Sequence, residues 1–377
     1  MQVSEKSCAP FLNFINVSYI NKMAGEVFVV LPPATQPNLI IYGRVSYDEC
    51  QEIIYFPSGA QPNIKLRNIE IEGKNSYGII LSKSNKAWGG LSGSNDKNVT
   101  IGLVYRKNES GILGDELLRL ALERSSSAED AIDTIAKLVN DYSKEPSKEE
   151  MPTYGFVICD PRSAWILNLV GSLWAAEKIN DKFRWIGNGL TIETKIDKCS
   201  ENLQEKCKSF LLWNGEDDFN FKQIFDSTNV LASNAKDIEH DDDTPFTVQK
   251  MFDLLRSINH VGDKCKSSHV SVINKSGITV NWFTATSTKE SVFKPFIFTP
   301  NVRISPLTKV KDGEELTLLN KLHSQRNWDV VGTLLQSLEN TCVEEVNNFI
   351  NENPGTPNQE LDDLMKDCVE AEVKFYR

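Results

Sequence analysis

Short apolar runs separated by turn residues dominate the first hundred residues, and this pattern predicts a series of β-strands. The runs are rich in β-branched and aromatic side chains, with Gly, Pro, Asn and Ser between them. They cover residues 27–31, 39–43, 50–56, 69–73, 77–82 and 99–105. Such a series is typical of the strands of a sheet.

The spacing of apolar residues changes between residues 114 and 142, where it predicts two amphipathic helices. Their apolar faces carry Leu117, Leu118, Leu120 and Ala121 in the first helix, and Ala131, Ile132, Ile135 and Leu138 in the second. Ser127, followed by Glu129 and Asp130, has the composition of a helix N-cap with acidic residues in the first turn.

The second half of the chain again predicts strands followed by helices. Strands are predicted at residues 154–160, 164–170, 173–179, 183–189, 269–274, 278–286 and 293–298. A helix is predicted over residues 247–258, and helices continue from residue 306 to the end. This order of elements predicts the α+β fold class.

The composition is that of an acidic globular protein, and it excludes several classes of function. A net charge of −11 argues against binding to duplex nucleic acid or to anionic membrane. No stretch reaches the roughly 18 uninterrupted apolar residues of a transmembrane segment, and Asn13 and Asn16 interrupt the apolar stretch near the start. The eight cysteines are scattered without a CxxC pair, which suits a reducing compartment. We therefore expect a cytoplasmic protein.

Two features have the residue types of a ligand site, but a structural role explains them better. Residues 239–243 (EHDDD) could supply metal ligands, yet such a run is usually a solvated acidic loop. His269 lies in a predicted strand, where a structural histidine is expected rather than a catalytic base. We therefore predict no metal and no cofactor.

Several segments, in order along the chain, resemble the secernins, a branch of the cysteine dipeptidases of the N-terminal-nucleophile hydrolase type. Examples are VFVVLPPA (27–34), LWAAEKI (173–179) and SVFKPFIF (291–298). The resemblance implies a four-layer α/β/β/α N-terminal-nucleophile hydrolase sandwich with a helical C-terminal extension. The implied parts are a divergent extension or insertion (1–25), a hydrolase-like domain (26–305) and a helical segment packed on it (306–377).

The resemblance also indicates where the nucleophile would lie, and this chain has no reactive side chain there. In the family, a Cys-Asp-Thr-Phe-Val segment leads into two prolines. The thiolate of that cysteine attacks the carbonyl, with its own α-amine as the base. Phe28 matches the family phenylalanine, so Gly25 stands where the cysteine belongs. Because glycine has no nucleophile, the resemblance implies a degenerate active site.

Other family positions divide into lost and surviving polar residues. Tyr47 replaces the carboxylate that would hold the amine, unless a shifted loop brings Asp48 into its place. Leu103 stands at the family's oxyanion asparagine, and loss of one oxyanion donor costs about 10²–10³ in rate. The residues that match their family counterparts, and are expected to form a surviving polar pocket, are Arg44, Asn188 and Arg256.

The leading functional hypothesis is a secernin-like protein of this peptidase family that is catalytically inactive and acts by binding. The resemblance implies a protein partner or a small peptide or amide ligand, and the family name reflects a link with regulated exocytosis. The oligomeric state is left open.

Two other hypotheses stand beside it. A cysteine-type dipeptidase or amidase would use Cys8 as its N-terminal nucleophile after processing. Removing residues 9–25, as an insertion or a gene-model artefact, would bring Ser7 and Cys8 next to Glu26 in the family pattern. An interaction scaffold would instead use acidic faces of the C-terminal helices, over residues 312–377.

Overall fold

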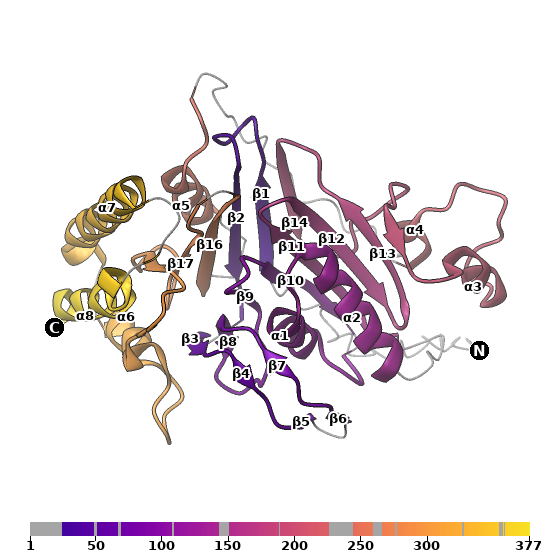
Figure 1. Ribbon diagram of the computed structural model, residues 1–377, viewed down its shortest axis with the longest axis horizontal. Coiled ribbons are helices and arrows are strands. Elements are labelled where there is room, and N and C mark those ends of the chain that lie inside the picture. The colour runs from indigo at the N-terminus through magenta and orange to yellow at the C-terminus, as the bar shows by residue number, and fades with distance from the viewer. Residues whose placement is uncertain are drawn as a thin grey trace, which may run out of the picture.

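A computed structural model shows the arrangement of helices and strands (Figure 1). It describes residues 25–48, 51–66, 69–107, 109–142, 151–187, 189–225, 244–258, 266–275, 277–325, 328–353, 357 and 359–377. Helices and antiparallel strands both contribute to the core, so the predicted α+β class is confirmed.

Among these residues, the strands form two large antiparallel sheets and two small ones. The six-stranded sheet has the order β14–β1–β2–β16–β17–β18. Its strands are β1 (Gly25–Val30), β2 (Leu39–Ser46), β14 (Phe183–Gly187), β16 (Ser267–Asn274), β17 (Val280–Phe283) and β18 (Lys294–Phe296).

The eight-stranded sheet has the order β15–β13–β12–β11–β10–β9–β8–β3. Its strands are β3 (Gln51–Phe56), β8 (Ile79–Ser84), β9 (Ser92–Asn95), β10 (Thr100–Lys107), β11 (Thr153–Asp160), β12 (Ser163–Val170), β13 (Leu173–Lys178) and β15 (Lys198–Cys199). The small sheets pair β4 (Gly59–Ala60) with β7 (Asn75–Ser76), and β5 (Ile64–Leu66) with β6 (Ile69–Ile71).

Helices α1 (Gly114–Arg124) and α2 (Ala128–Tyr142) pack on the eight-stranded sheet, at the two positions that the apolar spacing predicts. The N-cap prediction is also confirmed. Ser127 Oγ accepts a hydrogen bond from the Asp130 backbone N–H at 3.1 Å, which satisfies a donor in the first turn of α2.

The other long helices lie on the side of the six-stranded sheet away from the eight-stranded sheet, where α5, α7 and α8 contact its strands and α6 packs against α8 and η1 (Figure 1). They are α5 (Val248–Ser257), α6 (Leu318–Gln325), α7 (Trp328–Glu352) and α8 (Leu364–Tyr376). Shorter elements are α3 (Leu203–Ser209), α4 (Phe221–Phe225) and the 3₁₀ turns η1 (Pro306–Thr308) and η2 (Gln359–Leu361). Within the described ranges, no helix combines the length and hydropathy of a membrane span.

Three of the buried apolar clusters separate the molecule into helix, sheet, sheet and helix layers. One lies between α1, α2 and the eight-stranded sheet, one between the two sheets, and one between the six-stranded sheet and the helices α5, α7 and α8. Strand β1 contributes to two of these clusters. Val27 and Val29 join the cluster between the sheets, and Phe28 and Val30 join the one under the helices. The continuous apolar run at 27–31 follows from this burial on both faces.

Candidate functional site

Gly25 is buried at the first residue of β1, where it pairs with Ser46 of β2. A β-carbon built on Gly25 would lie 2.2 Å from the carbonyl oxygen of Val45 and 2.8 Å from Nη2 of Arg44. Both distances are shorter than van der Waals contact, and the carbonyl belongs to the backbone of the neighbouring strand. The structure therefore has no space for a side chain at the position where the resemblance implies the nucleophile.

The guanidinium of Arg44 fills that space. Arg44 lies in β2, is 1% exposed, and donates from Nε and Nη2 to the carbonyl oxygen of Leu103 at 3.2 and 2.9 Å. Burial lowers the pKa of Arg44, while Tyr42 and Asp48 oppose that shift through their charges. Arg44 therefore ties β2 to β10 across the space between the two sheets.

Leu103 contributes its backbone, and not its side chain, to this contact. The Leu103 side chain is fully buried in the cluster between α1 and the eight-stranded sheet, and it lies against Gly114 at the start of α1. Its carbonyl points the other way, toward Arg44. The contact is independent of the residue type at position 103.

Tyr47 takes part in a group of hydrogen bonds centred on Glu26. Its hydroxyl donates to Glu26 Oε1 at 2.5 Å, and the indole Nε1 of Trp185 donates to Glu26 Oε2 at 2.6 Å. Tyr47 and Trp185 pack against the apolar cluster on the helix-covered face of the six-stranded sheet. Glu26, which is 3% exposed, is a site residue that the sequence interpretation missed.

Asp48 is a carboxylate whose charge acts on Arg44. Its Oδ1 accepts from Arg106 Nη2 at 2.7 Å, and Asp48 and Arg106 both shift the pKa of Arg44 through their charges. Asp48 is the residue that the shifted-loop alternative would bring to the family's carboxylate position. Arg106, on β10, could not be found from the sequence pattern because it lies next to a register shift in the β10–β11 pairing, between Leu103 and Tyr105.

A row of buried polar side chains crosses between the sheets beside Arg44. Ser92 Oγ of β9 lies 3.2 Å from the Tyr42 hydroxyl and 2.7 Å from His269 Nδ1. His269 Nε2 lies 2.9 Å from Ser271 Oγ, which donates to Asn281 Oδ1 at 2.6 Å. Burial and the charge of nearby Arg44 together lower the pKa of His269 to about 3, although a hydrogen bond to Asn281 acts in the opposite direction. A neutral, 2% exposed histidine fits the predicted structural role.

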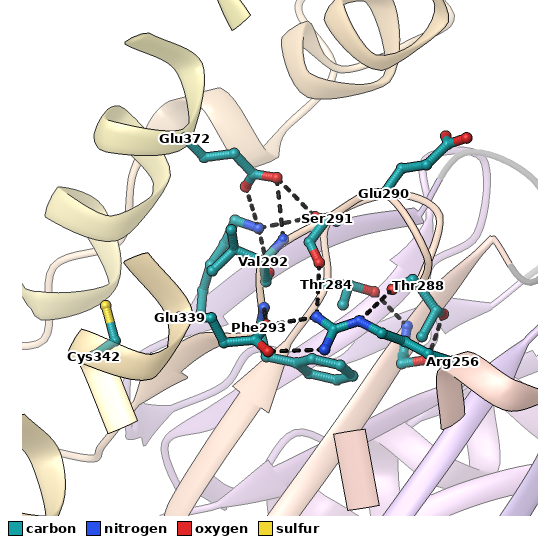
Figure 2. A network of polar contacts seen from close by, with 12 residues as sticks. Arg256, Thr284, Thr288, Glu290, Ser291, Val292, Phe293, Glu339, Cys342 and Glu372 are labelled. Carbon is teal, nitrogen blue, oxygen red and sulfur yellow. Dashed lines mark hydrogen bonds and ion pairs between the residues drawn. The ribbon is translucent and has the colours of Figure 1, made fainter. Parts of the chain in front are cut away.

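Arg256 lies on α5, in the helical layer beyond the six-stranded sheet (Figure 2). Its Nη1 and Nη2 donate to the two carboxylate oxygens of Glu339 on α7, at 2.8 and 2.6 Å, and its guanidinium stacks over the Phe293 ring. Arg44 instead faces the opposite sheet. The structure does not bring Arg44 and Arg256 together.

Three further positions from the sequence interpretation lie outside the described residues: Cys8, Asn188 and the acidic run 239–243. In the part of the chain that the structure describes, no group of three or more His, Cys, Asp or Glu side chains is placed to hold a metal ion.

Comparison with known proteins gives a family match. A model described as peptidase family C69 matches residues 90–330, more than half of the chain. A mutant of the conjugated bile acid hydrolase from Clostridium perfringens is 13% identical, covering 74% of this chain and 99% of that chain, with a TM-score of 0.41.

The Caenorhabditis elegans ortholog of N-acylethanolamine-hydrolyzing acid amidase is 14% identical, covering 66% of this chain and 92% of that chain, with a TM-score of 0.33. Both TM-scores lie below 0.5, so the assignment rests on the family match.

Proposed function

This chain belongs to peptidase family C69, and we propose that it has lost the hydrolytic chemistry of an N-terminal-nucleophile hydrolase while keeping the architecture. Within the family, the proposal is a secernin-like cytoplasmic protein that acts by binding. One observation carries it: Gly25 has no side chain, and the guanidinium of Arg44 and a backbone carbonyl occupy the space that a thiol would need.

The electrostatics around Gly25 support the same conclusion. A reactive thiolate needs a base and donors that stabilise the developing oxyanion. Here the nearest cation, Arg44, already donates two hydrogen bonds to the Leu103 carbonyl. The nearest histidine of the buried polar row, His269, is neutral and 2% exposed. Neither group is available to a substrate.

The proposed ligand is a small peptide or amide, and Arg106 is the cation best placed to meet it. The Arg106 side chain is 17% exposed and pairs with Asp48, whereas Arg44 is buried. A ligand carboxylate could form the same charge-assisted contact as Asp48. We expect Arg106→Gln to weaken binding of an unprotected dipeptide about tenfold in calorimetric titration. Unchanged affinity would exclude this ligand site.

The test of inactivity compares the purified full chain with a Cys8→Ser variant on dipeptide and amide substrates. Intact mass and N-terminal sequencing are measured on the same sample. We expect no hydrolysis above the buffer rate by either protein, and an N-terminus that does not begin at Cys8. Turnover that disappears in Cys8→Ser, from a chain that begins at Cys8, would establish the dipeptidase or amidase alternative.

The secernin resemblance extends the proposal to regulated exocytosis through a protein partner. Adding the purified protein to permeabilised secretory cells is expected to change the amount of Ca²⁺-triggered release. If neither addition nor depletion of the protein changes that release, the exocytosis part of the proposal is wrong.

A further inference from the structure

Two buried thiols meet between the helices α7 and α8. Cys342 on α7 and Cys368 on α8 have their Sγ atoms 3.7 Å apart, and the residues are 5% and 3% exposed. Other described cysteines, such as Cys159 and Cys199, are also free. A sulfur–sulfur distance of 3.7 Å needs only a small contraction to reach the roughly 2.05 Å of a disulfide.

Both helices are anchored to residues 292–293 through a buried glutamate, Glu339 on α7 and Glu372 on α8 (Figure 2). Glu339, one turn before Cys342 on α7, accepts from the backbone N–H of Phe293 at 2.8 Å and pairs with Arg256. Glu372, one turn after Cys368 on α8, accepts from the backbone N–H of Val292 at 3.2 Å.

The side chain of Lys294 completes the anchor on α8. It is fully buried, forms an ion pair with Glu372, and donates to Ser291 Oγ at 3.0 Å. Buried charged contacts of this kind hold the backbones of the two helices in a fixed relation. The short distance between the thiols is therefore set by the surrounding contacts.

We propose that Cys342 and Cys368 are an oxidation site at which hydrogen peroxide forms a disulfide that joins α7 to α8. The Cys342 thiolate attacks one peroxide oxygen, the O–O bond breaks, and water leaves after proton uptake, giving a sulfenic acid. The Cys368 sulfur attacks the Cys342 sulfur, and a second water leaves with the disulfide. Two thiols lose two electrons, and one peroxide gains them.

The opposite effects of their shared contact on the pKa values of the two thiols favour Cys342 as the attacking sulfur. The side-chain contact with Cys368 lowers the pKa of Cys342, and the charge of Lys294 lowers it too, while burial and two nearby glutamates raise it. The same contact, together with burial, raises the pKa of Cys368. Because a thiolate is the reactive form of cysteine, the first oxidation falls on Cys342.

The experiment treats the purified full chain with a few equivalents of hydrogen peroxide, blocks the remaining thiols, and maps peptides by mass spectrometry without reduction. We expect one cross-linked peptide that contains Cys342 and Cys368. The new loop of residues 342–368 should raise the thermal midpoint by roughly 2–5 °C, and dithiothreitol should reverse the rise.

Two variants separate this site from general oxidation. Cys342→Ser should lose both the cross-linked peptide and the thermal shift, while Cys199→Ser, at an exposed thiol, should keep both. The proposal is overturned if Cys342 and Cys368 of the wild-type chain remain unoxidised, or are oxidised separately. The pair would then act only as two small apolar side chains in the core. The wild-type map gives this answer even if Cys342→Ser fails to fold.

Discussion

Replacing Gly25 by cysteine restores the type of nucleophile that the resemblance implies, yet we expect an inactive and less stable protein. The new β-carbon would lie 2.2 Å from the Val45 carbonyl oxygen and 2.8 Å from Nη2 of Arg44. The end of the arginine can move, but the carbonyl belongs to β2, and every residue of β1 pairs with β2. The substitution must therefore displace one strand from the other.

The size of the effect follows from the two contacts that are disturbed. Overpacking of a buried position costs about 1–3 kcal/mol, and a hydrogen bond lost by a charged group costs about 1.5–3 kcal/mol. If Arg44 loses one of its bonds to Leu103, the free energy of unfolding should fall by about 2.5–6 kcal/mol. An unfolding entropy of about 2.1 cal/mol/K per residue converts this loss into a thermal midpoint roughly 3–8 °C lower.

Thermal and urea unfolding of Gly25→Cys measure this loss, and Gly25→Ala is the matched control. Alanine adds the same β-carbon without the thiol, so equal losses in both variants identify a steric cause. Hydrolysis of dipeptides is measured on the same samples. A Gly25→Cys protein with an unchanged thermal midpoint that also cleaves a dipeptide would refute the reasoning, because the site would then be open and competent.

Three further predictions concern buried titratable side chains. Glu339→Ala leaves Arg256 without its carboxylate, and the free energy of unfolding measured in urea should fall by about 3 kcal/mol. As a control, Glu344→Ala, at an exposed position of the same helix, should lower it by less than about 0.5 kcal/mol. Equal losses in the two variants would contradict the ion-pair argument. Burial lowers the folded-state pKa of His269 from 6.5 to about 3, so the unfolded chain binds a proton below pH 6.5 that the folded protein does not. Stability should therefore fall by about 1.4 kcal/mol per pH unit from pH 6.5 toward pH 3, and an unchanged slope in His269→Asn would rule out this residue as the cause. Burial opposes ionisation of Glu372, but Lys294 and His323 outweigh it and lower its pKa from 4.5 to about 2. The stability that ionised Glu372 contributes is present above pH 4.5 and is lost toward pH 2. The loss of stability in Glu372→Gln should therefore be full at pH 7 and shrink below pH 4.5. A difference in stability between the variant and the wild type that does not change with pH would show that charge is not involved.

The sequence by itself determined most of the elements and the absence of a side chain at residue 25. The helices α1 and α2 lie where the apolar spacing and Ser127 predict them, since a helix needs only local spacing and a cap. The continuous apolar run of β1 likewise indicates a strand that is buried on both faces. Strand β9 (Ser92–Asn95) has no apolar residue and escaped prediction, because its polar side chains are satisfied by Tyr42, His269 and Asn281 from distant strands.

Only the tertiary structure decided which groups meet around Gly25. Leu103 contacts Arg44 through its backbone carbonyl. Every residue type has this carbonyl, so the sequence could not predict the contact. Arg256 pairs with a glutamate of the helical layer and not with groups near Arg44. The carboxylate whose charge acts on Arg44 is that of Asp48, which pairs with Arg106. Periodicity states which face of an element is buried, but the identity of the opposing element depends on how the two sheets stack. The partners across that interface are set by packing between segments far apart in the chain, and no local pattern specifies them.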